Sequence, residues 1–364
     1  MTGLDDTLLG DARALAALDT GGVLRSAATA GAQVRSTAHA AQEAKVADLA
    51  GHRPRALVLL RRAGAATPAF VMLAALLGPM CPVPVVLSDA VPSWIGPLDV
   101  VVAHTSDPSD GDLAESVGRA VARGAEVVLS APGEGPVASA GAGRVRLGEP
   151  RIPVPPGLDL PRAPAVGLTT VSALELLATP LSPGLDELAD TLDGEAERNA
   201  PGNEAFMNPA KSLALRLAEH TPLLWGTDPL AAAVAQHAAA ALATHAGVVA
   251  HAAGIAQAAT ATALVRRLDA GAERDIFHDP FADDPATEAP PPGLVLIGTA
   301  EEDPLHVALR LFGRDRSSAD LLHPVDEVAR GVRNAPLLRA GLAATRFDLA
   351  AVYLGLATRT ITPA

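Results

Sequence analysis

Short, continuously apolar runs alternate along the chain with longer segments whose apolar residues recur every three or four positions. Continuous runs of this kind are typical of strands buried on both faces of a parallel sheet, whereas the wider spacing is typical of helices with one buried face. In the first half, strands are predicted at 55–60, 83–87, 99–103 and 126–130, with a fifth at either 144–147 or 151–154. Helices are predicted before and between them at 8–18, 23–49, 69–77 and 112–123.

The second half repeats this alternation after a stretch rich in Pro and Gly, 133–164, which predicts loops. Strands are predicted at 222–226 and 294–298, 307–312 fits a helix or a strand, and 320–324 stays ambiguous. Helices are predicted at 167–178, 184–198, 210–219, 230–245 and 346–359, and a surface loop at 280–292. The pattern predicts an α/β protein with two subdomains, 1–165 with the leading helices and 166–364, each a parallel sheet flanked by helices.

Composition narrows the class of protein further. The chain has 364 residues and a net charge of −13, with 49% hydrophobic residues but only 2% aromatic ones. Ala, Val and Leu must therefore build the core. The negative net charge excludes electrostatic binding to nucleic acid or to anionic lipid, since both need clustered Lys and Arg. The single cysteine, Cys81, excludes an internal disulfide and a cysteine-based zinc site. Because no signal-peptide pattern or long unbroken apolar run is present, we expect a cytoplasmic protein with no membrane partner.

The turns after Leu60, Ala103 and Gly226 are candidates for ligand binding, because open parallel sheets bind ligands beyond the carboxyl ends of their strands. The first turn, 61–67, carries Arg61, Arg62 and Gly64. A small-residue turn that enters a helix can present backbone N–H groups to a phosphate, and the two arginines could add positive charge. A plain strand-to-helix turn also explains these residues.

The second turn, 104–110, contains Ser106 and Ser109, whose hydroxyls suit a phosphate. It also contains Asp107 and Asp110, whose carboxylates would repel one. The alternative is that Ser109 or Asp110 caps the N-terminus of the following helix. Both interpretations stay open at this stage.

Several stretches of the chain resemble one family. The matching segments are 19–24, 30–34, 203–214, 222–231 and 347–357, of which 203–231 and 347–357 are distinctive together. Through them the chain resembles the bifunctional phosphoglucose/phosphomannose isomerases of bacteria and archaea, which are built from SIS (sugar isomerase) domains. The resemblance implies two SIS subdomains, each a flavodoxin-like three-layer sandwich, in a homodimer. It also implies a sugar phosphate as the ligand, and no cofactor is expected.

The reaction of that family moves a proton between neighbouring carbons of a sugar phosphate through an enediolate. The resemblance therefore implies a glutamate base, a histidine for ring opening, an arginine near the developing oxyanion, and a cradle of hydroxyls and amides for the phosphate. Here, Thr244 stands where the glutamate is implied and Thr260 lies where the histidine is implied. The ligand-binding residues that the resemblance retains are Gly64, Ser106, Ser109 and Arg162, the last as an anion stabiliser.

A threonine cannot remove a carbon-bound proton at neutral pH, so the departures predict that isomerase catalysis is lost. His245 or His251 could replace the missing groups, although a lone histidine on or beside an Ala-rich helix more often packs or caps. No metal site is expected, because the ten histidines show no zinc-like spacing. Trp225 is expected to pack beneath a crevice, and 301–303 to be a solvated charge run.

Two functions of different class follow. One is a non-catalytic SIS pseudoenzyme of carbohydrate metabolism that binds a phosphosugar, regulates a partner or serves as a scaffold. The alternative is an active phosphosugar isomerase with rearranged catalytic residues, which would convert glucose 6-phosphate and mannose 6-phosphate to fructose 6-phosphate.

Overall fold

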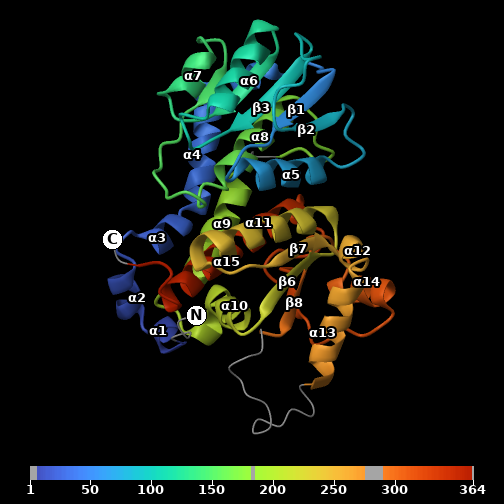
Figure 1. Ribbon diagram of the computed structural model, residues 1–364. Helices are drawn as coiled ribbons and strands as arrows, with labels where there is room; N and C mark the ends of the chain where they lie inside the picture. The colour runs from blue at the N-terminus through green and yellow to red at the C-terminus, as the bar shows by residue number, and fades with distance from the viewer. Residues whose placement is uncertain (1–5, 182–184, 275–289, 363–364) are drawn as a thin grey trace. The chain divides into compact units, whose positions relative to one another are not determined.

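The computed structural model describes residues 6–181, 185–274 and 290–362 (Figure 1). The chain forms two compact units. The first unit is Arg25–Ala196, and the second unit combines Met1–Leu24 with Glu197–Ala364. Each unit contains one all-parallel sheet with helices around it, which confirms the predicted α/β class.

The compact units divide the chain differently from the two predicted subdomains. The predicted division after residue 165 falls inside helix α8 (Arg162–Ala173). That helix packs on α4 (Ala30–Glu43), α5 (Ala66–Leu77) and the first sheet, so it stays with the first unit. The first helix, α1 (Asp6–Gly10), instead packs with the second unit.

The sheet of the first unit has five parallel strands in the order β2-β1-β3-β4-β5. They are β1 (Ala56–Leu60), β2 (Val85–Ser88), β3 (Asp99–His104), β4 (Glu126–Ser130) and β5 (Arg146–Gly148). Every residue of β1 and β3 is buried, which is why β1 and the run 100–103 of β3 are continuously apolar in sequence. The two ends of β3, Asp99 and His104, are polar but also buried. Of the two places predicted for the fifth strand, the first is correct.

The helices of the first unit lie mostly where the spacing predicts them, but one of them, Pro136–Ala140, falls in the stretch 133–164 that predicts loops. They are α3 (Val23–Ala27), which begins in the second unit, α4, α5, α6 (Gly111–Ala122), α7 (Pro136–Ala140), α8 and α9 (Asp186–Arg198). The single helix predicted at 23–49 is wrong, because the chain forms α3, α4 and a short 3₁₀ turn, η1 (Val46–Leu49). Lys45 adopts a left-handed conformation with φ 55°, which ends α4 before η1 begins.

The sheet of the second unit has four parallel strands in the order β7-β6-β8-β9. They are β6 (Thr221–Gly226), β7 (His251–Gly254), β8 (Pro292–Ile297) and β9 (Asp320–Leu322). The ambiguous segment 320–324 thus contributes an edge strand. Strand β7 is not among the predicted strands, because His-Ala-Ala-Gly contains no Val, Ile, Thr, Phe, Tyr or Trp.

The second unit contains further helices besides α1. They are α2 (Ala12–Leu18), η2 (Ala205–Met207), α10 (Pro209–Ala218), α11 (Pro229–Ala246), α12 (Ile255–Ala258), α13 (Thr262–Arg274), α14 (Pro304–Phe312) and α15 (Ala335–Ala357). The ambiguous segment 307–312 is therefore helical. The helix predicted at 8–18 is divided into α1 and α2 at Asp11, whose side chain caps α2 by accepting from the Arg13 amide. Figure 1 shows α11 and α15 side by side, and α15 also packs on α10.

Helix α15 begins well before its predicted start at residue 346. Among the described residues it is the one helix long and apolar enough to cross a membrane, but 94% of its most apolar window is buried inside the protein. A helix that is apolar on all sides is typical of the centre of a protein as well as of a membrane span. In this structure α15 is the central helix of the second unit.

Candidate functional site

The carboxyl edge of the first sheet is where the sequence predicts a ligand. Gly64 lies in the turn after β1 with φ +83° and is exposed, and no atom lies within 4 Å of where a side chain would start. The turn therefore needs a glycine for its backbone conformation, but the surroundings of Gly64 do not enclose a ligand. The hydroxyl of Thr67 donates to the Arg62 carbonyl at 2.8 Å and fixes the entry into α5.

The two arginines of this turn are held by carboxylates. Arg62 donates from Nε and Nη2 to the two oxygens of Asp110, at 2.8 and 2.5 Å, and its Nη2 lies 3.3 Å from Asp112. The hydrogen bond to Asp110 is the main cause that raises the pKa of Arg62. Arg61 pairs with Asp89 at 2.9 Å. Both arginines of the turn are therefore paired with carboxylates of the same unit, Arg62 in a mostly buried pair and Arg61 in an exposed one.

The capping alternative for the second turn is correct for Asp110. Its Oδ1 accepts from the Leu113 amide at 3.0 Å, at the start of α6. Burial raises the pKa of Asp110, but its hydrogen bonds from Arg62 and Leu113 outweigh burial and lower the pKa overall. Ser109 is exposed, and its amide donates to Asp107 at 2.8 Å. This turn is thus built as a helix cap with acidic side chains.

A polar network that the sequence analysis missed lies at the same edge. His104, the last residue of β3, contacts the Ser130 hydroxyl through Nδ1 at 3.0 Å and Asp159 Oδ2 through Nε2 at 3.2 Å. Ser106 donates to the same Asp159 oxygen at 2.5 Å. His104, Ser130 and Asp159 are buried, and Ser106 is exposed. The hydrogen-bonded pairs of this network are 26 to 55 positions apart in sequence, so no local spacing could reveal it.

The order of the groups decides what this network can do. Burial raises the pKa of Asp159, but the hydrogen bond and charge of His104 and the Ser106 hydroxyl outweigh burial and lower the pKa to about 2. In a nucleophilic serine site the histidine lies between serine and carboxylate. Ser130 stands in that order with His104 and Asp159, but Ser130 is buried. For the exposed Ser106, in contrast, the carboxylate lies between serine and histidine. A carboxylate with so low a pKa is a weak base, so Ser106 is not an activated nucleophile. The network holds the loop of Asp159 against β3.

Arg162 is the one charged residue that the resemblance retains, and the structure buries it. Its guanidinium Nη2 donates to the Ile152 carbonyl from the start of α8. Burial lowers the pKa of Arg162, while the charge of Asp159 acts in the opposite direction. Arg162 is 6% exposed, so its side chain holds the loop before α8 and offers little surface to a ligand.

The two threonines lie in the second unit. Thr244 is exposed on the last turns of α11, and Thr260 is exposed after α12, where its hydroxyl donates to the Gln257 carbonyl at 2.7 Å. His251 is exposed at the start of β7 and accepts from the Trp225 indole at 3.2 Å, and His245 is buried on α11. The structure brings Gly64, Ser106, Ser109 and Arg162 to one edge of the first sheet, and places Thr244 and Thr260 on separate elements.

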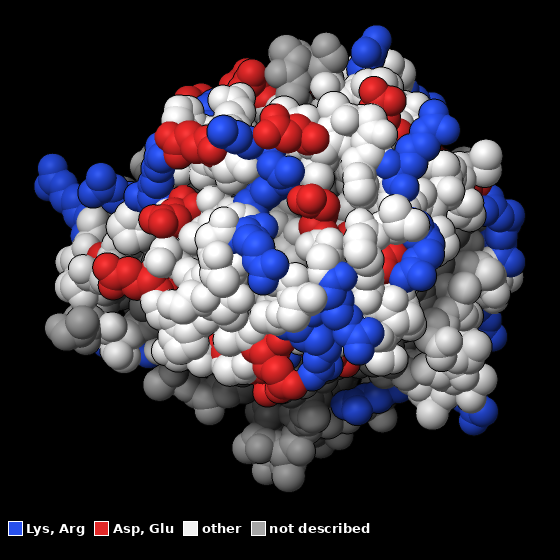
Figure 2. All heavy atoms as spheres, turned by 90° about the horizontal axis from the view of Figure 1, so that it is seen from above, with Lys and Arg blue, Asp and Glu red and all other residues white. Residues whose placement is uncertain are grey.

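Trp225 and the acidic segments have structural roles. Trp225 is fully buried and stacks on Phe312 with ring centroids 5.6 Å apart. Glu301 pairs with the fully buried Arg339 at 3.1 Å, so the segment 301–303 is not only a solvated charge run. Within residues 6–181, 185–274 and 290–362, no three His, Cys, Asp or Glu side chains gather as a metal site would need. Figure 2 shows basic and acidic side chains interleaved on the face that it displays.

Comparison with known proteins finds similarity to one protein family and to several solved structures. Residues 206–360 match the family of bacterial phospho-glucose isomerase C-terminal SIS domains. A proposed phosphosugar isomerase from Silicibacter pomeroyi DSS-3 is 16% identical, with a TM-score of 0.62 over 94% of this chain and 99% of that chain. Tagatose-6-phosphate ketose/aldose isomerase from Escherichia coli is 9% identical, with a TM-score of 0.57 over 94% and 93%.

A third solved structure extends the comparison beyond isomerases. The C-terminal domain of glucosamine-fructose-6-phosphate aminotransferase from Francisella tularensis is 9% identical, with a TM-score of 0.57 over 93% of this chain and 96% of that chain. No curated protein sequence matches the chain. The family match and the solved structures confirm the resemblance to SIS domains and the predicted fold class, and at these identities the structures bear on the fold alone.

Proposed function

Because residues 206–360 form a SIS domain of the bacterial phospho-glucose isomerase type, we propose that this chain keeps the fold of a phosphosugar isomerase without the catalysis. It would act as a regulatory or scaffold pseudoenzyme of carbohydrate metabolism. The observation that carries this proposal is the state of the arginines at the carboxyl edge of the first sheet. Arg61 and Arg62 are bound to carboxylates, and Arg162 is bound to a carbonyl inside the protein.

The charge balance of this edge disfavours a phosphate. Asp110 takes up Arg62 with both oxygens, and Asp107 adds a further carboxylate to the same turn. A phosphate dianion would have to displace Asp110 from Arg62 and from the N-terminus of α6 at once. Such a displacement uncovers a partly buried carboxylate, which opposes binding.

The residues at the implied acid and base positions support the same proposal. Thr244 and Thr260 carry hydroxyls whose protons are far too tightly held for a base at neutral pH. Aldose–ketose isomerisation needs a group that removes a proton from carbon, and general-base catalysis of that kind requires a pKa near the working pH. Asp159 is ionised at that pH, but its oxygen Oδ2 is already taken by Ser106 and His104.

Turnover of glucose 6-phosphate and mannose 6-phosphate tests the proposal. We expect no rate above a protein-free control from folded protein whose thermal unfolding transition has been verified. Turnover that disappears in Asp159→Asn or Arg162→Gln but survives in the exposed variant Glu134→Gln would overturn it. Thermal unfolding in the presence of fructose 6-phosphate provides a second readout, because a ligand that binds at this edge raises the unfolding temperature. A rise that is altered in Arg62→Gln would show that fructose 6-phosphate binds at this edge.

The alternative is the active isomerase with rearranged residues, and one observation favours it. His104 and Asp159 form a buried histidine–carboxylate pair at the edge of the sheet where ligands bind in this class of fold. If a substrate displaced Ser106, Asp159 and His104 would supply a base and an acid. This alternative requires turnover that is lost in both His104→Gln and Asp159→Asn.

The assembly state is proposed from the resemblance alone. We propose that the chain forms a homodimer in the cytoplasm, since the SIS isomerases that it resembles build their sites near subunit contacts. Light scattering coupled to gel filtration tests the assembly: a dimer mass supports it, and a monomer mass at the same concentration contradicts it.

A further inference from the structure

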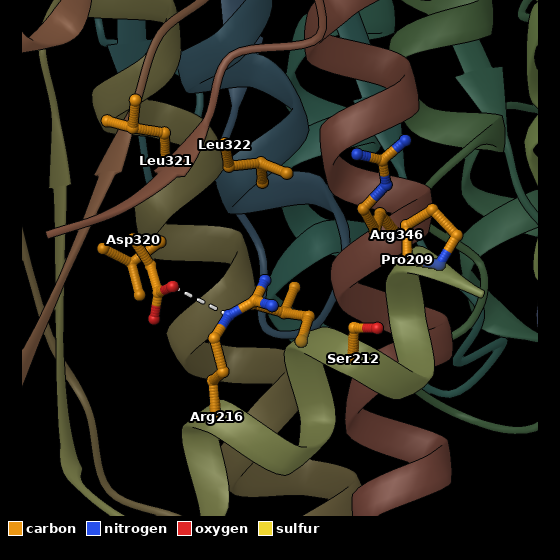
Figure 3. Close-up of a pocket in the computed structure, with 9 residues that line it drawn as sticks. Pro209, Ser212, Arg216, Asp320, Leu321, Leu322 and Arg346 are labelled. Atoms are coloured by element: carbon orange, nitrogen blue, oxygen red, sulfur yellow. Dashed lines mark ion pairs between the residues drawn. The ribbon is translucent and has the colours of Figure 1, made fainter. Parts of the chain in front are cut away.

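A cavity of about 230 Å³ lies in the second unit, and none of the candidate residues discussed so far lines it. It opens between α10, α15, the inner strand β8 and the edge strand β9 (Figure 3). Helix α10 packs on α15 and β6, while β9 is a three-residue strand at the edge of the sheet, so space remains between α10 and β9. Val295 and Asp320, which line the cavity, pair with each other in the sheet. The cavity therefore lies along the face of the sheet and not beyond the carboxyl ends of its strands.

Arg216 is the residue of this cavity that can bind an anion. Figure 3 shows its guanidinium extending from α10 into the space beside Asp320. Only Nε is engaged, with Asp320 Oδ1 at 2.8 Å, and Nη1 and Nη2 have no partner among the described residues. The paired N–H groups of a guanidinium bind two oxygens of a carboxylate or phosphate side by side. In contrast with Arg62, Arg216 can therefore accept an anion without releasing its own carboxylate.

A second guanidinium borders the same space. Arg346 comes from α15, is 7% exposed, and is paired with Glu327 at 2.7 Å. It is held in place and does not need a ligand for its charge to be balanced. Of the charged side chains that line the cavity directly, two are arginines and one is an aspartate, so the lining favours an anion over a cation.

The other lining groups select for hydroxyls and short carbon chains. The Ser212 hydroxyl donates to the Ala205 carbonyl at 2.8 Å, which leaves its oxygen able to accept a hydrogen bond. Asp320 has a second oxygen that can do the same. The buried side chains of Leu213, Val295 and Leu322 form the apolar part of the wall. At roughly 30 Å³ per water, the cavity has the volume of seven or eight waters, which suits a small molecule.

We propose that this cavity binds a small hydroxylated anion, with its carboxylate or phosphate on Arg216 and its hydroxyls on Asp320 and Ser212. The inference does not depend on whether the first sheet has lost catalysis, because it uses a different unit and different residues. Such a ligand would bind between an edge strand and two helices, one of them the central helix α15, so binding would stabilise the second unit.

Calorimetric titration of the full chain with four probes tests the chemistry. The probes are glycerol 3-phosphate, glycerate, inorganic phosphate and glycerol. We expect glycerol 3-phosphate, glycerate or both to bind at millimolar concentration, to bind more tightly than inorganic phosphate, and glycerol not to bind. Binding of only one of the two identifies the phosphate or the carboxylate as the anion used. Absence of binding by both, or equal binding of inorganic phosphate, overturns the proposal.

Substitutions then locate the ligand. Arg216→Gln should weaken binding about tenfold or more, because it removes charge-assisted hydrogen bonds to the anion. Asp320→Asn should strengthen binding several-fold, because it removes a competing negative charge while keeping the hydrogen-bonding shape. A purely structural role would weaken binding in both variants. Arg13→Gln, on the exposed surface of α2, is the matched control. Unchanged affinity in Arg216→Gln, or weaker binding in Asp320→Asn, contradicts the proposed site.

Discussion

Arg62 in the first unit and Arg216 in the second unit are held in opposite ways. At the carboxyl edge of the first sheet, Arg62 gives Nε and Nη2 to Asp110, and the side chains of both residues are less than one-fifth exposed. In the second unit, Arg216 gives only Nε to Asp320, and the side chains of that pair are 46% and 39% exposed. The number of arginines near a candidate site is therefore a poor guide to whether the site binds an anion. What matters is how many of their N–H groups the protein leaves unbound.

The largest effect in this comparison should come from Asp159. Asp159→Ala leaves His104 and Ser106 without their shared acceptor, and we expect it to lower the free energy of unfolding by about 3 kcal/mol. The chain has two tryptophans, Trp94 in the first unit and Trp225 in the second. In a Trp225→Phe background, Trp94 fluorescence therefore follows urea unfolding of the first unit.

The control for this prediction is the exposed residue Glu134. Glu134→Ala should change the free energy of unfolding by less than about 0.5 kcal/mol, as surface substitutions usually do. Equal losses in Asp159→Ala and Glu134→Ala would show that the buried network does not stabilise the first unit.

A somewhat smaller effect should appear as a dependence on pH. The pKa of Asp159 is about 2 in the folded chain against an ordinary value of 3.8. Since the folded pKa is the lower one, the ionised carboxylate stabilises the fold above pH 3.8, and this stability is lost as the pH falls through 3.8 to about 2. The loss amounts to about 2 kcal/mol.

Urea titrations at several pH values across this acid range measure the effect, again with Trp94 as the reporter. Other carboxylates also titrate in this range, so the quantity of interest is the difference from Asp159→Asn. That variant should show a shallower acid loss of stability, and an identical loss in both proteins would contradict the low pKa.

The smallest effects should separate the two arginines directly. Arg62→Gln leaves the partly buried Asp110 without its main partner and should lower the free energy of unfolding by about 1 kcal/mol. Arg216→Gln breaks a more exposed pair and should change it by less than about 0.5 kcal/mol. Thermal unfolding of both variants against the parent protein checks this order. A larger loss for Arg216→Gln than for Arg62→Gln would reverse the comparison on which the two proposals rest.

Much of the fold could be predicted from the sequence because buried strands and helix faces appear in it as runs or regular spacings of apolar residues. Strand β1 and the middle residues of β3 and β4 are continuously apolar, since both faces of a parallel sheet are covered. Elements whose buried residues are polar or small do not show this pattern and are not predicted from it. Arg339 lies near the start of α15 and is fully buried, because its guanidinium donates to the carbonyls of Val328 and Thr299. Because Arg339 is charged, the spacing of apolar residues does not predict that the first part of α15 is a buried helix.

The candidate site was harder to predict than the fold. Local chemistry at Asp110 could be anticipated, since an aspartate before a helix is a common N-cap. The partner that neutralises it, Arg62, is 48 positions away, and Asp159 is 55 positions from His104. Contacts at such separations are set by how the strands and loops assemble. The sequence alone therefore predicts which residue types lie at the sheet edge, but not which of them are already paired.

Hydrogen exchange at the sugar carbon tests the central claim most directly, since isomerisation through an enediolate removes a proton from carbon. Fructose 6-phosphate is incubated with the folded chain in deuterated buffer, and deuterium at its first carbon is followed by proton NMR. Thr244, Thr260 and the occupied Asp159 offer no base for this step, so we predict no incorporation above the protein-free control. Incorporation that is abolished in Asp159→Asn and retained in Glu134→Gln would contradict the account and establish an active isomerase.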